Sequence, residues 1–197
     1  MTKNKFFRPL RAAHAVAALA FFAQSPVSAA TAADWRIDPA RTTIAFAIDA
    51  AGFPRTEGRF RQFEGHISID FAQPSRSNVA FHVRSQSVDV GSPSFNDYVR
   101  SATFLDSAKH PSIDFVSTSV RSTSDHSVRV SGELTLLGVT KPLTVDVTVA
   151  RETAGGRMRL DFHAETRIDR LEFGMNSGFP LVSRDVELTI SSAATET

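Results

Sequence analysis

The chain has 197 residues, a formal net charge of +1 and no cysteine. The absence of cysteine excludes disulfides, c-type haem attachment, thiolate zinc sites and a cysteine nucleophile. A chain of this length can bury a core without disulfides, and the length predicts a single folded domain.

The first 32 residues have the organisation of a secretory signal peptide. A short apolar run, residues 12–23, follows a basic start and precedes several small residues suited to cleavage. The run is too short to span a bilayer, so we expect cleavage and release into the periplasm without stable membrane insertion. The basic residues of this segment are Lys3, Lys5, Arg8 and Arg11. Without them the net charge is about −3, and no basic stripe remains to indicate a nucleic-acid partner.

Residues 33–197 form the predicted domain, and most of its segments alternate apolar and polar side chains. A period of two is typical of strands with one buried and one exposed face. We predict strands over residues 35–51, 59–71, 79–84, 113–117, 128–136, 143–149, 157–169 and 181–190.

Two of these strands form the clearest structural pattern in the chain. Apolar residues alternate over 128–136 and again over 143–149, on either side of a short turn. Gly138 permits the backbone angles that a tight turn needs. Pro142 is expected to begin the second strand, because proline does not fit inside a central strand. The pattern predicts a long antiparallel hairpin with one face turned inward.

One interval, from Pro93 to Ser107, has apolar residues spaced by three and four instead of two. Such spacing indicates a short helix or helical turns. Long successive strands with one helical insert favour an all-β fold, an antiparallel up-and-down barrel of about eight strands. An immunoglobulin-like sandwich is the second choice and a transmembrane barrel the third.

The string Gly-Glu-Leu-Thr-Leu-Leu-Gly-Val-Thr-Lys-Pro, residues 132–142, closely resembles the signature of the YceI-like family. Weaker matches occur in the expected order over the rest of the domain, at residues 35–39, 87–89, 98–106, 110–115, 168–175 and 185–188. The chain departs from the family at Arg41 and Thr42, where members usually carry His-Ser.

The resemblance implies a lipocalin-like extended barrel with an elongated apolar cavity. Its ligand would be a polyisoprenoid, a quinone or a similar amphiphile, and neither a cofactor nor a metal is expected. The partners expected are therefore this lipid and, as an open alternative, a second copy in a homodimer.

Phenylalanines recur on the inward faces of the predicted strands. A packed core is the ordinary explanation, and a tunnel for a hydrocarbon chain is the alternative. Periodicity alone does not separate a filled barrel from a hollow one, and the family resemblance favours the hollow one. On this basis the candidate ligand-binding residues are Phe46, Phe63, Ile69, Phe81, Val83, Phe95, Tyr98, Phe104, Phe115, Leu134, Leu136, Phe162, Arg170 and Phe173.

Arg170 is the candidate for binding a polar head group, because arginine binds phosphates with two hydrogen bonds. An ion pair with Asp97, Asp169 or Glu172 is the competing interpretation. The aromatic residues of the helical insert, Phe95, Tyr98 and Phe104, are expected to close one end of the barrel as a lid or a plug.

No catalytic residues are assigned, since the sequence has neither a His-Glu-x-x-His nor a Gly-x-Ser-x-Gly motif. The leading hypothesis is a non-enzymatic periplasmic carrier or sequestering protein for an isoprenoid or similar long-chain lipid. A structural or stress-related interaction module with a filled barrel is the alternative, and a lipid hydrolase comes third.

Overall fold

The structure, a computed structural model, describes residues 32–197. All but the last residue of the predicted signal peptide therefore lies outside the described residues. No helix in residues 32–197 is long and apolar enough to cross a membrane. The strands are β1 Ala33–Ile37, β2 Thr43–Ala50, β3 Thr56–Phe60, β4 Phe63–Ile69, β5 Asn78–Arg84, β6 Val88–Asp89, β7 Ser112–Ser124, β8 Ser127–Leu136, β9 Val139–Ala154, β10 Arg157–Asp169 and β11 Val182–Glu196.

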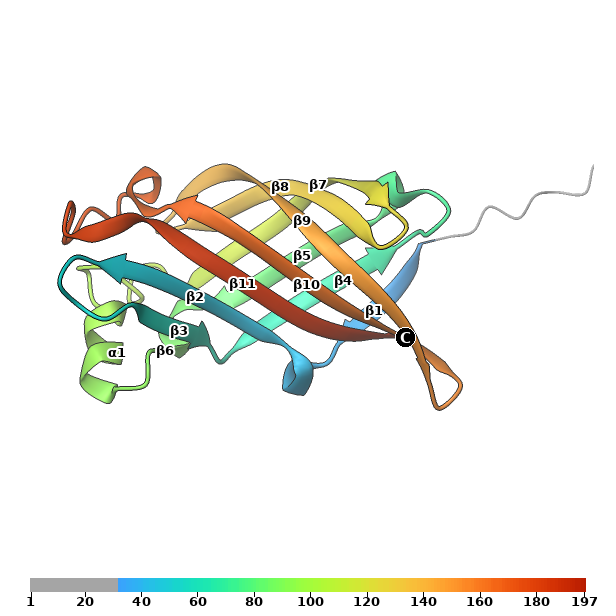
Figure 1. Cartoon of the computed structure of the whole chain (residues 1–197), viewed down its shortest axis with the longest axis horizontal. Coiled ribbons are helices and arrows are strands. Elements are labelled where there is room, and N and C mark those ends of the chain that lie inside the picture. The colour runs from blue at the N-terminus through green and yellow to red at the C-terminus, as the bar shows by residue number, and fades with distance from the viewer. Residues whose placement is uncertain (1–31) are drawn as a thin grey trace, which may run out of the picture.

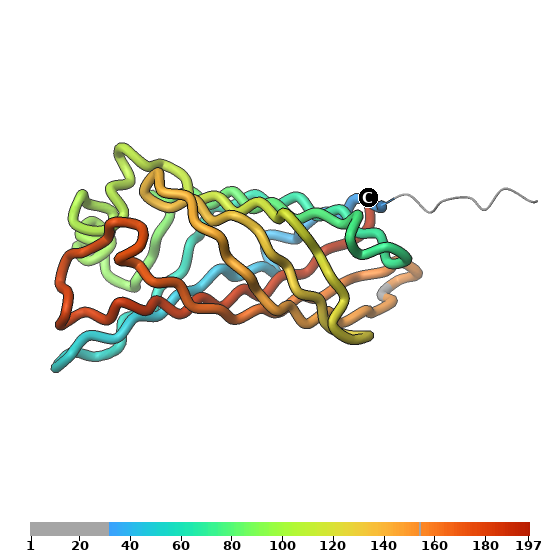
Figure 2. Tube along the Cα trace, turned by 90° about the horizontal axis from the view of Figure 1, so that it is seen from above, coloured from blue at the N-terminus to red at the C-terminus, as the bar shows by residue number. Residues whose placement is uncertain are grey.

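These strands form one antiparallel sheet that closes on itself (Figure 1). The order is β1-β4-β5-β7-β8-β9-β10-β11, and β11 returns to β1, which gives a closed ring of eight strands. β2, β3 and β6 continue the wall beyond β11 toward one end of the molecule. The Cα trace seen from above shows that the barrel is elongated (Figure 2). The predicted all-β barrel is confirmed.

Two of the predicted long strands are interrupted. Residues 35–51 are split by a 3-10 turn at Pro39–Arg41, and residues 59–71 by a break at Arg61 and Gln62. Pro39 lacks the N–H that a strand would use, and the carboxylate of Asp38 accepts a hydrogen bond from the N–H of Ala40 instead. The interruptions bend the wall at these points without opening the ring.

The hairpin of β8 and β9 is confirmed, with Leu136 opposite Val139. Leu137 and Gly138 both have positive φ, 52° and 73°, as a two-residue hairpin turn of type I′ requires. Pro142 lies inside β9 and not at its start, which corrects the prediction. Proline fits there because β9 is paired with β10 only over Val147 to Ala154, so at Pro142 one side of β9 has no neighbouring strand to hydrogen bond.

The helical insert is confirmed over a shorter range. α1 runs from Pro93 to Arg100, and turns occupy the rest of the predicted interval. The helix lies at one end of the barrel, beside β3 and β6 and far from both ends of the described chain (Figure 1). We call this the α1 end and the opposite one the terminal end.

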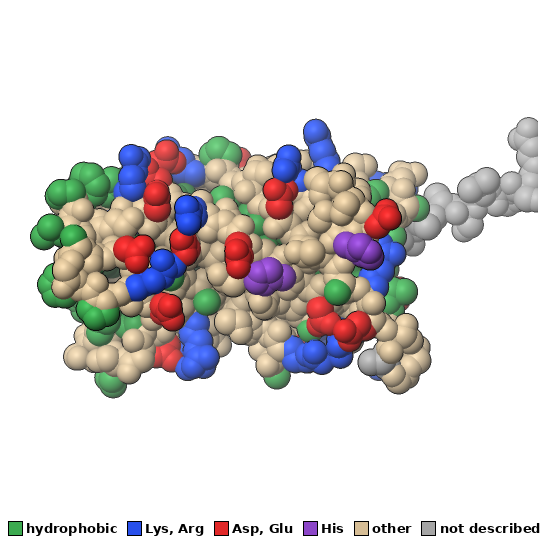
Figure 3. All heavy atoms as spheres, in the orientation of Figure 1, with side chains coloured by type: hydrophobic (Ala, Val, Ile, Leu, Met, Phe, Trp, Pro, Cys, Tyr) green, Lys and Arg blue, Asp and Glu red, His purple; other side chains and the backbone are tan. Residues whose placement is uncertain are grey.

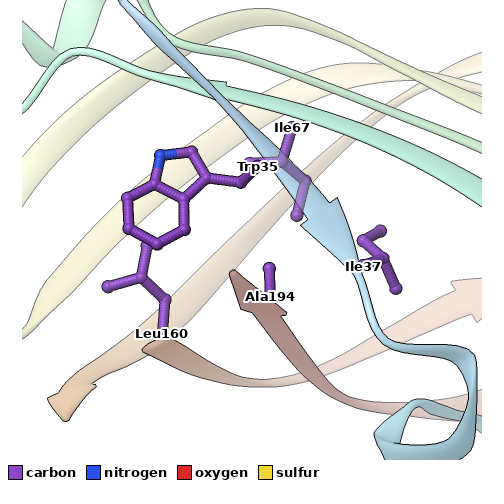
Figure 4. Close-up of a cluster of buried hydrophobic side chains, with 5 residues drawn as sticks. All are labelled: Trp35, Ile37, Ile67, Leu160 and Ala194. Carbon is purple, nitrogen blue, oxygen red and sulfur yellow. The ribbon is translucent and has the colours of Figure 1, made fainter. Parts of the chain in front are cut away.

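Two clusters of buried apolar side chains fill parts of the interior. One, near the terminal end, consists of Trp35, Ile37, Ile67, Leu160 and Ala194 (Figure 4). The other, near the α1 end, consists of Val88, Leu105, Leu134, Leu136 and Phe173. The indole of Trp35 packs over Leu160 and meets the ring of Phe71 edge-on, with centroids 6.0 Å apart. Side chains thus fill part of the interior toward each end of the barrel and leave room for a cavity beside them.

We predict that Trp35→Ala lowers the free energy of unfolding by about 3–5 kcal/mol, because the side chain is 3% exposed and its loss leaves a hole. Urea denaturation followed by circular dichroism measures the change. Val116→Ala, at an exposed position of β7, is the matched control and should change stability by less than about 0.5 kcal/mol. Equal losses in the two variants would contradict the assignment of Trp35 to the core.

Candidate functional site

The interior of the barrel contains an elongated cavity of about 1310 Å³. Its walls are formed mainly by apolar side chains on the inward faces of β2, β4, β5, β7, β8, β9, β10 and β11. At the α1 end the lining passes to α1 and to the loop between β2 and β3. The volume exceeds the range of roughly 300–1,000 Å³ that is usual for pockets binding drug-sized ligands. The cavity therefore has room for a longer ligand.

Most of the residues proposed from the sequence line this cavity. They are Phe46, Ile69, Phe81, Val83, Phe95, Tyr98, Phe104, Phe115, Leu134, Leu136, Phe162 and Arg170. Phe63 does not line it, because it lies at the start of β4 beside the break at Arg61 and Gln62. Phe173 does not line it either, since it is buried in the cluster around Val88. Contact with a ligand stays a prediction for all of these residues.

Several lining residues were not proposed from the sequence. Phe60, Val130, Ile168, Leu188 and Ile190 also face the cavity. The alternation in residues 128–136 and 157–169 already placed Val130 and Ile168 on the inward face, so that signal was available. Phe60 ends the short strand β3, where the alternation is too brief to assign a face.

Three wall glycines lie under phenylalanine rings. A Cβ atom on Gly58 would lie 2.4 Å from Cζ of Phe46, and one on Gly132 would lie 2.6 Å from Cζ of Phe115. At Gly65 the ring of Phe81 would lie 3.0 Å from such a Cβ atom, and the side chain of Ile37 would lie closer still. Phe46 and Gly58 are direct partners across β2 and β3. Each ring thus occupies space that a neighbouring side chain would fill, so it lies against the wall and leaves the middle of the barrel open.

The terminal end of the cavity is the more polar one. Its lining includes Ser68, Asp70, Ser124, His126 and Arg151. Asp70 is buried, and its Oδ1 accepts hydrogen bonds from the N–H groups of Ala72 and Gln73. Its Oδ2 has no hydrogen-bond partner among the described residues and lies 3.6 Å from Nε of Arg76.

Aromatic side chains stand at the α1 end. Phe95 and Tyr98 stack with centroids 6.1 Å apart, and Tyr98 meets Phe104 edge-on at 5.2 Å. All three line the cavity, while Phe95 and Tyr98 are also exposed to solvent. This is the position that a lid or a plug would occupy.

Polar contacts fix α1 to the barrel. The side chain of Asn96 accepts a hydrogen bond from the N–H of Val90 at 2.7 Å, and Arg100 donates to the carbonyl of Val88 at 2.9 Å. Asp89, in the neighbouring strand β6, has a lowered pKa of about 2. The largest cause is a hydrogen bond from the N–H of Gly91, and the second is the hydrogen bond from the Arg61 guanidinium. At any pH above the ordinary carboxyl pKa, this lowered pKa stabilises the folded state. The contribution is lost as the pH falls toward 2. Asp89 should therefore stay ionised and paired with Arg61 at neutral pH.

Arg170 is a buried charge of the site, and most of its N–H groups are engaged within the protein. Its guanidinium donates to the backbone carbonyls of Met175, Ser177, Val182 and Ser183, which engages four of its five N–H groups. Within residues 32–197 its side chain makes no ion pair, and Asp169 pairs with Arg184 instead. Burial lowers the pKa of Arg170, while the charge of Asp169 opposes that shift. The residue is a structural anchor for the segment between β10 and β11. The ion-pair interpretation is replaced, and head-group binding by Arg170 stays a prediction.

We predict that Arg170→Met destabilises the protein by about 3 kcal/mol, because it leaves four partly buried carbonyls without their donor. Thermal unfolding measures the loss, and Arg167→Met, at an exposed position of β10, is the control with little effect. A stable Arg170→Met variant that has lost lipid binding would instead support the head-group interpretation.

A second prediction concerns the glycines beneath the rings. In Gly58→Ala the new methyl group must push the ring of Phe46 into the lumen, because its close neighbours are side chains and not backbone. We expect weaker binding of a long-chain fluorescent lipid probe, on the order of tenfold, with a smaller loss for a short-chain probe. Adding Phe46→Leu should restore binding in the double variant, and failure of this rescue would contradict the packing argument.

Among residues 32–197, no group of His, Asp and Glu side chains is arranged to hold a metal ion. His82 pairs with Asp114, Nδ1 to Oδ1 at 2.6 Å, on the exposed outer face.

Comparison with known proteins gives consistent matches. The sequence model of the YceI-like domain matches residues 35–194. A UPF0312 protein of Azotobacter vinelandii is 35% identical, and Protein YceI of Escherichia coli is 34% identical; each alignment covers 82% of this chain and 86% of the relative.

Similar solved structures include the following two examples. BcnA of Burkholderia cenocepacia has a TM-score of 0.73 and 25% identity, covering 80% of this chain and 98% of BcnA. A polyisoprenoid binding domain from Saccharophagus degradans has a TM-score of 0.65 and 15% identity, covering 83% of this chain and 98% of that domain. The second likeness supports the fold alone.

Proposed function

The chain belongs to the YceI-like domain family, and from this premise we propose that it carries or sequesters an isoprenoid or similar long-chain amphiphile in its barrel cavity. The observation that supports this most directly is the mainly apolar cavity of about 1310 Å³ inside the barrel. A barrel that serves only as an interaction module would be expected to fill this space with side chains.

The energetics of burial support a ligand with a long tail. Burying one CH₂ group contributes about 0.8 kcal/mol, so about ten carbons contribute ~8 kcal/mol. That is the scale of micromolar affinity before the costs of ordering. Such a ligand needs few polar contacts, in keeping with walls whose polar groups lie mainly toward the terminal end.

We further propose that the protein acts in the periplasm, without catalysis, and that Phe95, Tyr98 and Phe104 control access to the cavity. The signal-peptide pattern of residues 1–32 supports the location. The position of the three aromatic residues, between the cavity and solvent, supports the role in access.

The test is organic extraction of the full-length gene product purified from the periplasm, with mass spectrometry of the extract. We expect a co-purified isoprenoid or other long-chain lipid. We also expect the intact mass of the protein to correspond to a mature chain whose first residue lies between Ala30 and Asp34. A wild-type protein that yields no lipid and does not bind added polyprenol would overturn the carrier function.

Paired variants sharpen the test. Phe115→Glu should abolish lipid retention while much of the protein stays folded, because a carboxylate against a hydrocarbon tail costs several kcal/mol, yet water can hydrate it in an empty cavity. Val116→Glu, the next residue on the exposed face of β7, should change neither lipid content nor folding. If Phe115→Glu unfolds and the wild type holds no lipid, the barrel is solid and its function lies on the surface.

A further inference from the structure

Exposed apolar side chains gather at the α1 end of the barrel. Figure 3 shows them (green) at the left of the molecule, where α1, the β2–β3 loop and the connection to β11 lie in Figure 1. The side chains are between 38% and 72% exposed, although apolar. We call them the apolar rim: Phe53, Phe95, Tyr98, Phe179 and Leu181.

The rim comes from three separate segments that meet around the mouth of the cavity. The N–H of Ala51 donates to the carbonyl of Leu181 at 2.8 Å, which joins the β2–β3 loop to the segment before β11. Phe53, Phe95 and Tyr98 line the cavity as well as facing solvent. The apolar surface of the rim is therefore continuous with the apolar wall of the cavity.

We propose that the apolar rim docks into the headgroup region of a lipid bilayer, with the mouth of the cavity facing the membrane. This rests on the proposed function, because a lipid carrier must take its ligand from a membrane. Aromatic and aliphatic side chains on loop tips can enter the headgroup–acyl boundary of a bilayer. Continuity of the rim with the cavity lets a lipid pass between the two without crossing water.

The charges near the rim favour insertion driven by apolar contact. Arg55 is paired with Asp49 and Glu187, and Arg184 is paired with Asp169. These arginines are thus engaged within the protein and offer little attraction to anionic headgroups. We therefore expect binding to zwitterionic vesicles that changes little with salt.

The experiment is flotation of the purified protein with phosphatidylcholine vesicles at low and high salt. The test variant is Phe179→Ser with Leu181→Ser, because neither side chain lines the cavity. The control is Val116→Ser with Met158→Ser, which removes exposed apolar side chains that lie outside the rim. We expect vesicle binding to fall on the order of tenfold in the test variant and to stay unchanged in the control, with co-purified lipid retained in both.

The outcomes separate docking from lipid carriage. A wild type that retains lipid but does not bind vesicles overturns the docking and leaves the carrier function standing. A wild type that binds vesicles but yields no lipid overturns the carrier function instead. Binding that disappears at high salt overturns insertion by apolar contact. If the test variant converts a dimer to a monomer in light scattering and vesicle binding is absent, the rim is covered by a second copy, which also overturns the proposal.

Discussion

Pairing of the first strand with the last is the constraint on which the barrel depends. A sheet of strands this long would expose unpaired N–H and C=O groups along two edges. Pairing of β1 with β11 closes the ring, and β2 covers the rest of the free side of β11. The pairing joins Trp35 to Glu196 and Ile37 to Ala194, so nearly the whole domain separates the partners in sequence. The ring therefore closes only when the final residues are available, which makes closure a late, non-local step in folding.

A closed ring of eight strands sets a radius just wide enough for side chains or one ligand. Whether side chains or a ligand occupy the interior depends on where the aromatic rings of the wall residues lie. Phe46 over Gly58 and Phe115 over Gly132 lie against neighbouring strands, so large apolar residues line the lumen without filling it. The side chain of Trp35 instead extends into the interior near the terminal end and fills it there. The same barrel thus has a packed section that stabilises it and an open section that can bind a ligand.

Period-two alternation carries enough information to predict the strands, the hairpin at Gly138 and the inward position of most lining residues. The helical spacing around Tyr98 likewise predicts α1, and the matched motifs predict the family. Features that depend on contacts between distant segments are not visible in the sequence. Pro142 fits within β9 because β10 does not pair with it there, a fact of the three-dimensional register.

Two functional features were missed for related reasons. The partners of Arg170 are backbone carbonyls, which every residue possesses, so no sequence pattern identifies them. Phe53, Phe179 and Leu181 lie in loops, where a single apolar residue is unremarkable until the fold brings the loops together.

Arg170 also determines how much conformational entropy the mouth of the barrel loses on binding. Its four carbonyl acceptors span residues 175–183, the segment that carries Phe179 and Leu181. The loop is thereby ordered before any ligand or surface is encountered, and little rotational freedom of its backbone remains to be lost. A charge buried inside the protein thus preorganises the surface through which the ligand would enter.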